Sequence, residues 1–304
     1  MAVDLLCLGE PILEFNQQPD GRYLPGHGGD TSNCAIAAAR QGAHVGYLTH
    51  VGADAFGRSF IDLWQAEGVD TTTVRAVEGG QTGIYFVTHG ADGHEFSYFR
   101  DGSAASRMTP ADLPRAALET AQILHVSGIS QAISQSAADT VFAAMEIVRA
   151  AGGRVSYDSN LRLKLWPLDR ARAIIHAGMA MADIALPGLE DAEALTGLTD
   201  PDRIADFYLG LGAGIVALTL GAEGTLVATP EKRRRVPGRP VSVVDATGAG
   251  DTFDGAFLAR IIAGDDPFTA AAYANAAASI AVQGYGAVAP IPRRADVEAF
   301  LATP

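Results

Sequence analysis

Two hydrophobic patterns alternate along this 304-residue chain. Short apolar runs bounded by turn residues are typical of buried parallel strands, whereas apolar residues spaced three or four apart predict helices. From residue 110 onwards the two patterns follow each other regularly. Strands are expected at 123–126, 154–157, 183–186 and 215–220, with helices between them. This order is typical of an α/β fold, in which helices cover both faces of a mostly parallel sheet.

The N-terminal part shows the same kinds of element, interrupted by two hairpin patterns. Strands are expected at 3–8 and 45–49, and helices at 34–40 and 56–67. The first hairpin turns at Pro19-Asp20-Gly21 and the second at Ala91-Asp92-Gly93. Their strands are expected at 12–15 and 22–24, and at 82–88 and 94–100. We expect the two hairpins to form one small sheet built from separate segments of the chain.

The stretch 241–262 joins a strand end, a glycine turn and a helix. Val241, Val243 and Val244 predict the strand end, and the apolar spacing after residue 252 predicts the helix. Glycine at 248 and 250 permits positive φ and close approach of a ligand, while the first free amides of the helix point into the turn. Together with the helix dipole, such a turn binds anions and would stabilise a phosphate during transfer.

Asp251 lies directly on this predicted anion site, and its carboxylate has two interpretations. It could be a helix-start carboxylate, which favours the helix dipole. However, a carboxylate at that place would repel a bound phosphate, so a catalytic use is the stronger interpretation. We expect Asp251 to be the general base that takes a proton from a hydroxyl attacking the phosphate.

The motif Asp245-Ala246-Thr247-Gly248-Ala249-Gly250-Asp251, followed by Gly255-Ala256-Phe257, resembles the C-terminal motif of the ribokinase-like (pfkB) sugar kinases. The resemblance implies a ribokinase-like fold and transfer of the ATP γ-phosphate to a sugar hydroxyl. It implies that Gly248, Ala249 and Gly250 form the anion hole and that Asp251 is the base. Ala246 departs from the residues usual after the first Asp of the motif.

An N-terminal stretch extends the resemblance to the other end of the chain. Gly28-Gly29 with Asn33, Gly42 and Gly52 resembles the second motif of the family, although Thr31 stands where a small residue is more usual. The resemblance also implies that the small sheet is a lid over the site. The expected division is an α/β core of residues 1–9, 28–80 and 104–304, with a discontinuous lid of residues 10–27 and 81–103.

Composition narrows the classes of partner. The chain is 48% hydrophobic and 19% charged, which suits a compact enzyme, and 22 Lys and Arg against 35 Asp and Glu give a net charge of −13. This balance argues against nucleic acid and anionic membranes as partners, and Lys232 to Arg235 reads as a solvated hairpin. Cys7 and Cys34 show no metal spacing, and neither a signal peptide nor a membrane-spanning run is visible, so a cytoplasmic location is expected.

The residues expected to bind ATP and its metal ions follow from the resemblance. It implies that Gly221, Gly224 and Asn275 contact ATP. Glu190 stands where the family's Asn-x-x-Glu motif has the Glu that helps to order Mg²⁺, but Pro187 replaces the Asn, so Glu190 could equally be a helix-start carboxylate. A monovalent cation at Asp245 and Thr247 is left open.

Two further segments resemble 2-keto-3-deoxygluconate kinases within the family. They are Tyr98-Phe99-Arg100 with Ser103 to Ser106, and Asp158-Ser159-Asn160-Leu161-Arg162 with Lys164-Leu165-Trp166. Arg100 and Arg162 would form charge-assisted pairs with the carboxylate of an acid sugar, although any single Arg is more often a surface residue. The resemblance implies that Gly29, Asp30, Asn33, Tyr85 and Tyr98 contact the rest of the sugar.

We therefore expect an ATP- and Mg²⁺-dependent kinase that phosphorylates the 6-hydroxyl of 2-keto-3-deoxygluconate. The alternatives are a neutral-sugar kinase of the same family, such as a fructokinase or ribokinase, and a sugar-binding regulator without turnover. A few strands leave one face of the small sheet poorly covered, so a homodimer through the lid is also expected.

Overall fold

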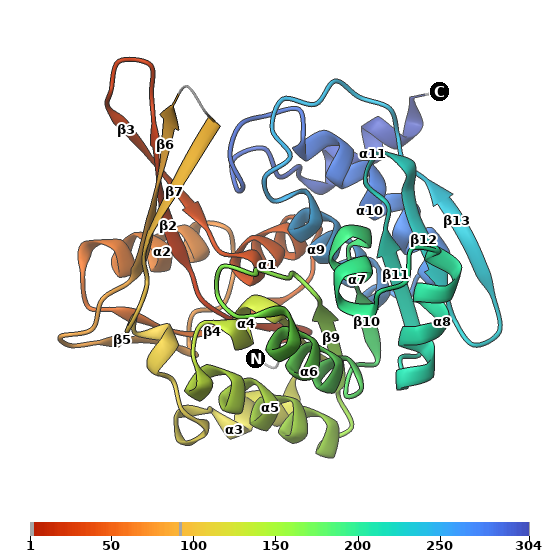
Figure 1. The fold of residues 1–304 in the computed structure, drawn as a ribbon, viewed down its shortest axis with the longest axis horizontal. Helices are drawn as coiled ribbons and strands as arrows, with labels where there is room; N and C mark the ends of the chain where they lie inside the picture. Colours follow the sequence, from red (N-terminus) through yellow and green to blue (C-terminus); the bar gives the residue numbers. More distant parts are fainter. Residues whose placement is uncertain (1–2, 91–92, 304) are drawn as a thin grey trace.

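The computed structural model describes residues 3–90 and 93–303, which form a large sheet, its covering helices and a small second sheet (Figure 1). The large sheet has the strand order β13-β12-β11-β10-β9-β8-β1-β4-β5. Neighbouring strands from β11 through to β5 are parallel, and at one edge β12 pairs antiparallel with both β11 and β13. The predicted α/β fold with a mostly parallel sheet is confirmed.

The strands of the large sheet are short and buried in its centre. They are β1 (Leu5–Leu8), β4 (Val45–Gly52), β5 (Val74–Val77), β8 (Ile123–Ser127), β9 (Arg154–Asp158), β10 (Ile184–Leu186), β11 (Ile215–Thr219), β12 (Gly224–Ala228) and β13 (Arg233–Pro237). Alternate residues of β1 enter different cores: Leu5 and Cys7 pack on one face of the sheet, and Leu6 and Leu8 on the other. Both faces of the sheet are therefore covered, as its continuous apolar runs predict.

Helices cover the two faces as separate groups. One core packs α1 (Asp30–Arg40), α9 (Ala249–Ile262) and α10 (Pro267–Ala281) against the sheet, and the other packs α5 (Gln135–Ala150), α6 (Leu168–Met179) and α8 (Pro201–Leu211). The remaining helices are α2 (Ala55–Ala66), α3 (Arg115–Thr120), α4 (Gly128–Ala132), α7 (Leu189–Thr196) and α11 (Arg294–Ala302), with short 3-10 turns at Ala105–Arg107, Pro110–Asp112 and Gly221–Glu223. No helix of the described residues is both long enough and apolar enough to cross a bilayer.

The small sheet has the order β3-β2-β6-β7 and projects from the rest of the molecule (Figure 1). Its strands are β2 (Ile12–Gln17), β3 (Tyr23–Gly28), β6 (Gly83–Gly90) and β7 (Gly93–Phe99). Parallel pairing of β2 with β6 joins the two hairpins, so the prediction of one sheet from separate segments is confirmed. Part of the second predicted turn, residues 91–92, lies outside the described residues.

The prediction of a strand end at Val241, Val243 and Val244 was wrong. Residues 238–248 belong to no strand or helix, and the side chains of Val243 and Val244 are exposed. The last strand ends earlier, in β13 (Arg233–Pro237), which forms a hairpin with β12 as expected for the basic run. A β-branched segment becomes a strand only where a neighbouring strand can pair with it, and β13 already occupies this edge of the sheet.

Candidate active site

The glycine turn before α9 has the conformation that an anion site needs. Gly248 caps the helix in the left-handed region, with φ of +75°, and a Cβ there would lie 3.0 Å from the Ala287 carbonyl oxygen. The backbone amide of Gly250 finds no backbone acceptor among the residues that the structure describes, and the amide of Asp251 bonds the carboxylate of its own residue. A Cβ at Gly250 would meet nothing within 4 Å. The free amide of Gly250 at the helix N-terminus therefore faces open space, where an anion can approach it.

Asp251 follows this turn on the first turn of α9, and its carboxylate is poised to titrate near neutral pH. Its Oδ2 accepts a hydrogen bond of 2.8 Å from Nδ2 of Asn33, on α1. Burial raises the pKa of Asp251 to about 7, and the negative charge of Asp30 acts in the same direction. The Asn33 hydrogen bond and the positive charge of Arg162 oppose the rise. A carboxylate with this pKa can take up a proton at physiological pH.

More carboxylates surround Asp251 than the sequence pattern indicated. Asp254, one helical turn further along α9, is 3% exposed and was not predicted as a site residue. Burial and the charge of Asp158 raise its pKa well above the usual range. Burial and the charge of Asp30 do the same for the pKa of Asp158, at the end of β9. The only sequence signal for Asp254 was its spacing of three residues from Asp251, which places both on one side of a helix.

The loop after β9 brings Arg162 to this group of carboxylates. Asn160 has a φ of +24° and donates from Nδ2 to Oδ2 of Asp30 at 2.8 Å, and the Leu161 amide donates to Oδ2 of Asp191 at 2.8 Å. These bonds hold the loop so that the positive charge of the exposed Arg162 partly opposes the rise that burial causes in the pKa of Asp251 and of Asp191. Arg162 and Asp251, far apart in the sequence, therefore interact electrostatically.

The small sheet contributes the two predicted tyrosines, Tyr85 and Tyr98, to the site. It also contributes an acid, Glu14, that was not predicted from the sequence. Tyr85 and Tyr98 stack with ring centroids 5.5 Å apart, and the Tyr85 hydroxyl donates to the carboxylate of Glu14. Glu14 lies opposite Tyr85 in the register of β2 and β6. Burial and the charges of Glu14 and Asp245 raise the pKa of Tyr85. Strand alternation could have placed Glu14 on this face, but its partner strand is set by the tertiary structure.

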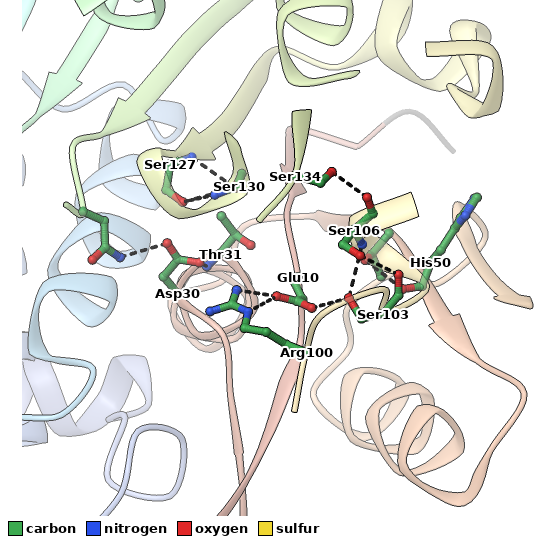
Figure 2. A network of polar contacts seen from close by, with 12 residues as sticks. Glu10, Asp30, Thr31, His50, Arg100, Ser103, Ser106, Ser127, Ser130 and Ser134 are labelled. Carbon is green, nitrogen blue, oxygen red and sulfur yellow. Dashed lines mark hydrogen bonds and ion pairs between the residues drawn. The ribbon is translucent and has the colours of Figure 1, made fainter. Parts of the chain in front are cut away.

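Arg100, the second predicted carboxylate ligand, is held by an internal acid. Its Nε donates to Oε2 of Glu10 at 2.8 Å, and its Nη2 bonds the same oxygen. The other oxygen of Glu10 accepts from the hydroxyl of Ser103 at 2.5 Å, so Glu10 lies between Arg100 and Ser103 (Figure 2). Nη1 of Arg100 makes no hydrogen bond within the described residues, which leaves one edge of the guanidinium for a ligand.

Three residues were expected to contact the nucleotide: Gly221, Gly224 and Asn275. For two of them, packing or hydrogen bonding within the protein already explains the type of residue. A Cβ at Gly224 would lie 2.2 Å from the Val236 carbonyl oxygen, so close packing already requires glycine there. Asn275 accepts from the Thr225 hydroxyl at 2.7 Å and donates to the carbonyl oxygen of Val236 at 3.0 Å. Gly221, with φ of +60°, is exposed, and a Cβ there would meet nothing within 4 Å. Gly221 is therefore the residue of the three that a ligand can approach most freely.

The predicted ion sites are weakly formed. Glu190 is exposed in the first turn of α7, and buried Pro187 uses its carbonyl oxygen to accept from the Thr219 amide at 3.0 Å. Asp245 accepts from the amide and hydroxyl of Thr247 at 2.9 and 2.7 Å and from the Gly286 amide at 2.9 Å. Within the described residues, no three His, Cys, Asp or Glu side chains are grouped as metal ligands. An ion held by one or two of these side chains would also need oxygens from the phosphates or the backbone.

Comparison with known proteins finds similarity over nearly the whole chain. Residues 9–294 match the pfkB family of carbohydrate kinases. The chain is 34% identical to a 2-dehydro-3-deoxygluconokinase of Bacillus subtilis (strain 168), covering 99% of this chain and 96% of that protein. It is also 34% identical to fructokinase-1 of Oryza sativa subsp. japonica, covering 96% of each. A candidate ribokinase II from E. coli, solved with ATP and Mg²⁺, superposes with a TM-score of 0.90 at 27% identity, covering 98% of this chain and 99% of that one.

Proposed function

Because this chain belongs to the pfkB family of carbohydrate kinases, we propose that it transfers the γ-phosphoryl group of ATP to the 6-hydroxyl of 2-keto-3-deoxygluconate. The observation that carries the proposal is the neighbourhood of Asp251. This carboxylate has a pKa of about 7, follows the free backbone amide of Gly250 and interacts with the charge of Arg162. The bacterial 2-dehydro-3-deoxygluconokinase supports the substrate, and the E. coli structure supports ATP and Mg²⁺.

In the proposed reaction, ionised Asp251 accepts the proton of the 6-hydroxyl while the hydroxyl oxygen forms a bond to the γ-phosphorus. The bond from the γ-phosphorus to the bridging oxygen breaks, and ADP leaves with that electron pair. The amide of Gly250, supported by the dipole of α9, stabilises the negative charge of the transferring group in the turn of Gly248 and Ala249. Glu190 is the side chain that would help to order Mg²⁺, which would supply further neutralisation of the phosphate charge.

The sugar is proposed to lie between the small sheet, acting as a lid, and the loops of the core. Asn33 directs Nδ2 to Asp251, while its buried Oδ1 has no partner among the described residues and can accept from a sugar hydroxyl. Tyr85 and Tyr98 form the lid wall, with Gly29 and Asp30 on the core side. Arg162 and the free edge of Arg100 supply the positive charge for the sugar carboxylate.

The nucleotide is proposed to lie beside Gly221, where the surface is open. Contacts from Gly224 and Asn275 remain proposals, because both residues also have packing or hydrogen-bonding roles. The loop of Asp245 and Thr247 is the proposed place for a monovalent cation.

A fructokinase is the second candidate, because the rice fructokinase is as similar in sequence as the bacterial kinase. A coupled assay of ADP release across acid and neutral keto sugars separates the two. We expect kcat/KM to be highest for 2-keto-3-deoxygluconate. A higher value for fructose would overturn the proposed substrate. If no sugar led to ADP release, the proposal that the protein is a kinase would be overturned.

A further inference from the structure

The chain crosses between the large domain and the small sheet at four places. The crossings lie between β1 and β2, between β3 and α1, between β5 and β6, and between β7 and the 3-10 turn that begins at Ala105. The orientation of the small sheet relative to α9 depends on these four segments. A residue that contacts all of them would therefore control where the tyrosines and Arg100 stand relative to Asp251.

Glu10 is such a residue. It belongs to the first crossing, and its backbone oxygen lies where a Cβ on Gly29, in the second crossing, would come within 2.5 Å. A Cβ on Gly83, at the end of the third crossing, would lie 2.9 Å from its Oε1. Its carboxylate bonds Arg100 and Ser103, both in the fourth crossing (Figure 2). Glycine at 29 and 83 thus gives room for Glu10 at the point where the crossings converge.

Burial of the Glu10 carboxylate makes its pairing with Arg100 costly to break. The Glu10 side chain is 1% exposed and that of Arg100 is 14% exposed, so neither charge is well solvated. A buried charge that loses one partner leaves the other uncompensated, which is costlier than replacing the pair. The Ala104 amide donates to the Gln81 carbonyl oxygen at 2.8 Å, which ties the third crossing to the fourth next to this pair.

We infer that Glu10 is a positioning residue, which fixes the small sheet on the core and aims the free edge of Arg100 at the sugar. The inference rests on the proposed function for the part that concerns Arg100. The part that concerns the four crossings does not depend on which sugar is bound. Glu10 reaches the reaction only through the groups it holds, and Asp251 keeps its own hydrogen bond from Asn33.

The test compares Glu10→Gln with a matched control, Glu67→Gln. Glu67 is also a largely buried acid paired with an arginine, Arg40, at 2.7 Å, with side chains 11% and 9% exposed. It also pairs with the exposed Arg293 at 3.4 Å, and it lies away from the crossings. Both variants lose one charged hydrogen-bonding partner, so both should lower the unfolding temperature. Only Glu10→Gln should raise the KM for sugar, by roughly tenfold or more, with kcat and the KM for ATP changed about twofold at most.

Hydrogen exchange measures the same role without turnover. In Glu10→Gln the Ala104 amide should exchange roughly tenfold faster than in the wild type, and in Glu67→Gln at the wild-type rate. Ser103→Ala removes the other bond of Glu10 without leaving a buried charge unpaired, and should give a smaller change in the same direction. It serves as the test if Glu10→Gln does not fold.

Kinetics on two sugars separate this inference from the substrate assignment. Arg100→Ala should lower kcat/KM for the acid sugar alone, whereas Glu10→Gln should lower it for acid and neutral sugars alike. If Arg100→Ala affects both sugars equally, Arg100 does not bind a sugar carboxylate and the part of the inference that concerns Arg100 fails, but the part that concerns the four crossings stands. If Ala104 exchange and sugar KM are at wild-type values in Glu10→Gln and Ser103→Ala, the inference is overturned.

Discussion

The pH dependence of catalysis tests the proposed role of Asp251 most directly. Asp251 must be ionised to accept the hydroxyl proton, and its pKa in the structure is about 7. Below that value the ionised fraction falls about tenfold per pH unit, so kcat/KM should fall with unit slope. At pH 6 the enzyme should retain roughly a tenth of its limiting kcat/KM, whereas a carboxylate at its ordinary pKa would lose almost nothing.

Substitution of charged residues near Asp251 should move the midpoint of the pH profile in a direction that can be predicted. Arg162→Met removes a positive charge that favours the ionised form, so the midpoint of the profile should move to higher pH. Asp30→Asn removes a negative charge that opposes ionisation, so the midpoint should move to lower pH. Both variants should also weaken sugar binding, and for that reason the midpoint rather than the absolute rate is compared.

The assay is initial-rate ADP release at subsaturating sugar and saturating ATP with Mg²⁺, between pH 5 and 9. Asp251→Asn is the control, since its kcat should fall by roughly two to four orders of magnitude and its residual activity should lose the limb near pH 7. A wild-type midpoint below pH 5, or shifts of the same sign in Arg162→Met and Asp30→Asn, would refute the reasoning. Near-normal kcat in Asp251→Asn would remove the general-base assignment altogether.

Three further results are expected. Arg162→Ala and Arg100→Ala should each cost about 1.5–3 kcal/mol in kcat/KM on 2-keto-3-deoxygluconate and little on fructose, because only the former has a carboxylate; equal losses would assign the arginines to the phosphates or the fold. Tyr23 and Phe99 are 38% and 59% exposed on the small sheet, and we propose that a second subunit covers them, so light scattering at micromolar concentration should give a dimer mass and not a monomer mass. Asn275→Ala should lower the free energy of unfolding by about 1–3 kcal/mol, as expected when buried partners are left unsatisfied, and an unchanged denaturation midpoint would contradict the structural role.

Local chemistry made much of the protein predictable. The apolar runs specified the parallel strands, because a strand buried on both faces must be apolar throughout. Alternation and turn residues specified both hairpins, although not the pairing of β2 with β6. The glycine turn and Asp251 could be recognised because a helix N-terminus with free amides depends only on adjacent residues. Val241 to Val244 shows the limit of this reasoning, since strand propensity without a neighbouring strand gave no strand.

Only the tertiary structure decided how the charged residues are paired. Asn33, Asp30 and Arg162 all act on Asp251 from distant parts of the sequence, and their balance with burial sets its pKa. Arg100 looked like a free ligand in the sequence, but the fold places it on Glu10. Periodicity and turn chemistry act between near neighbours, so the sequence alone determined the elements and the catalytic turn. Burial and electrostatic pairing act between segments that only the folded chain brings together, and these determined the properties of the site.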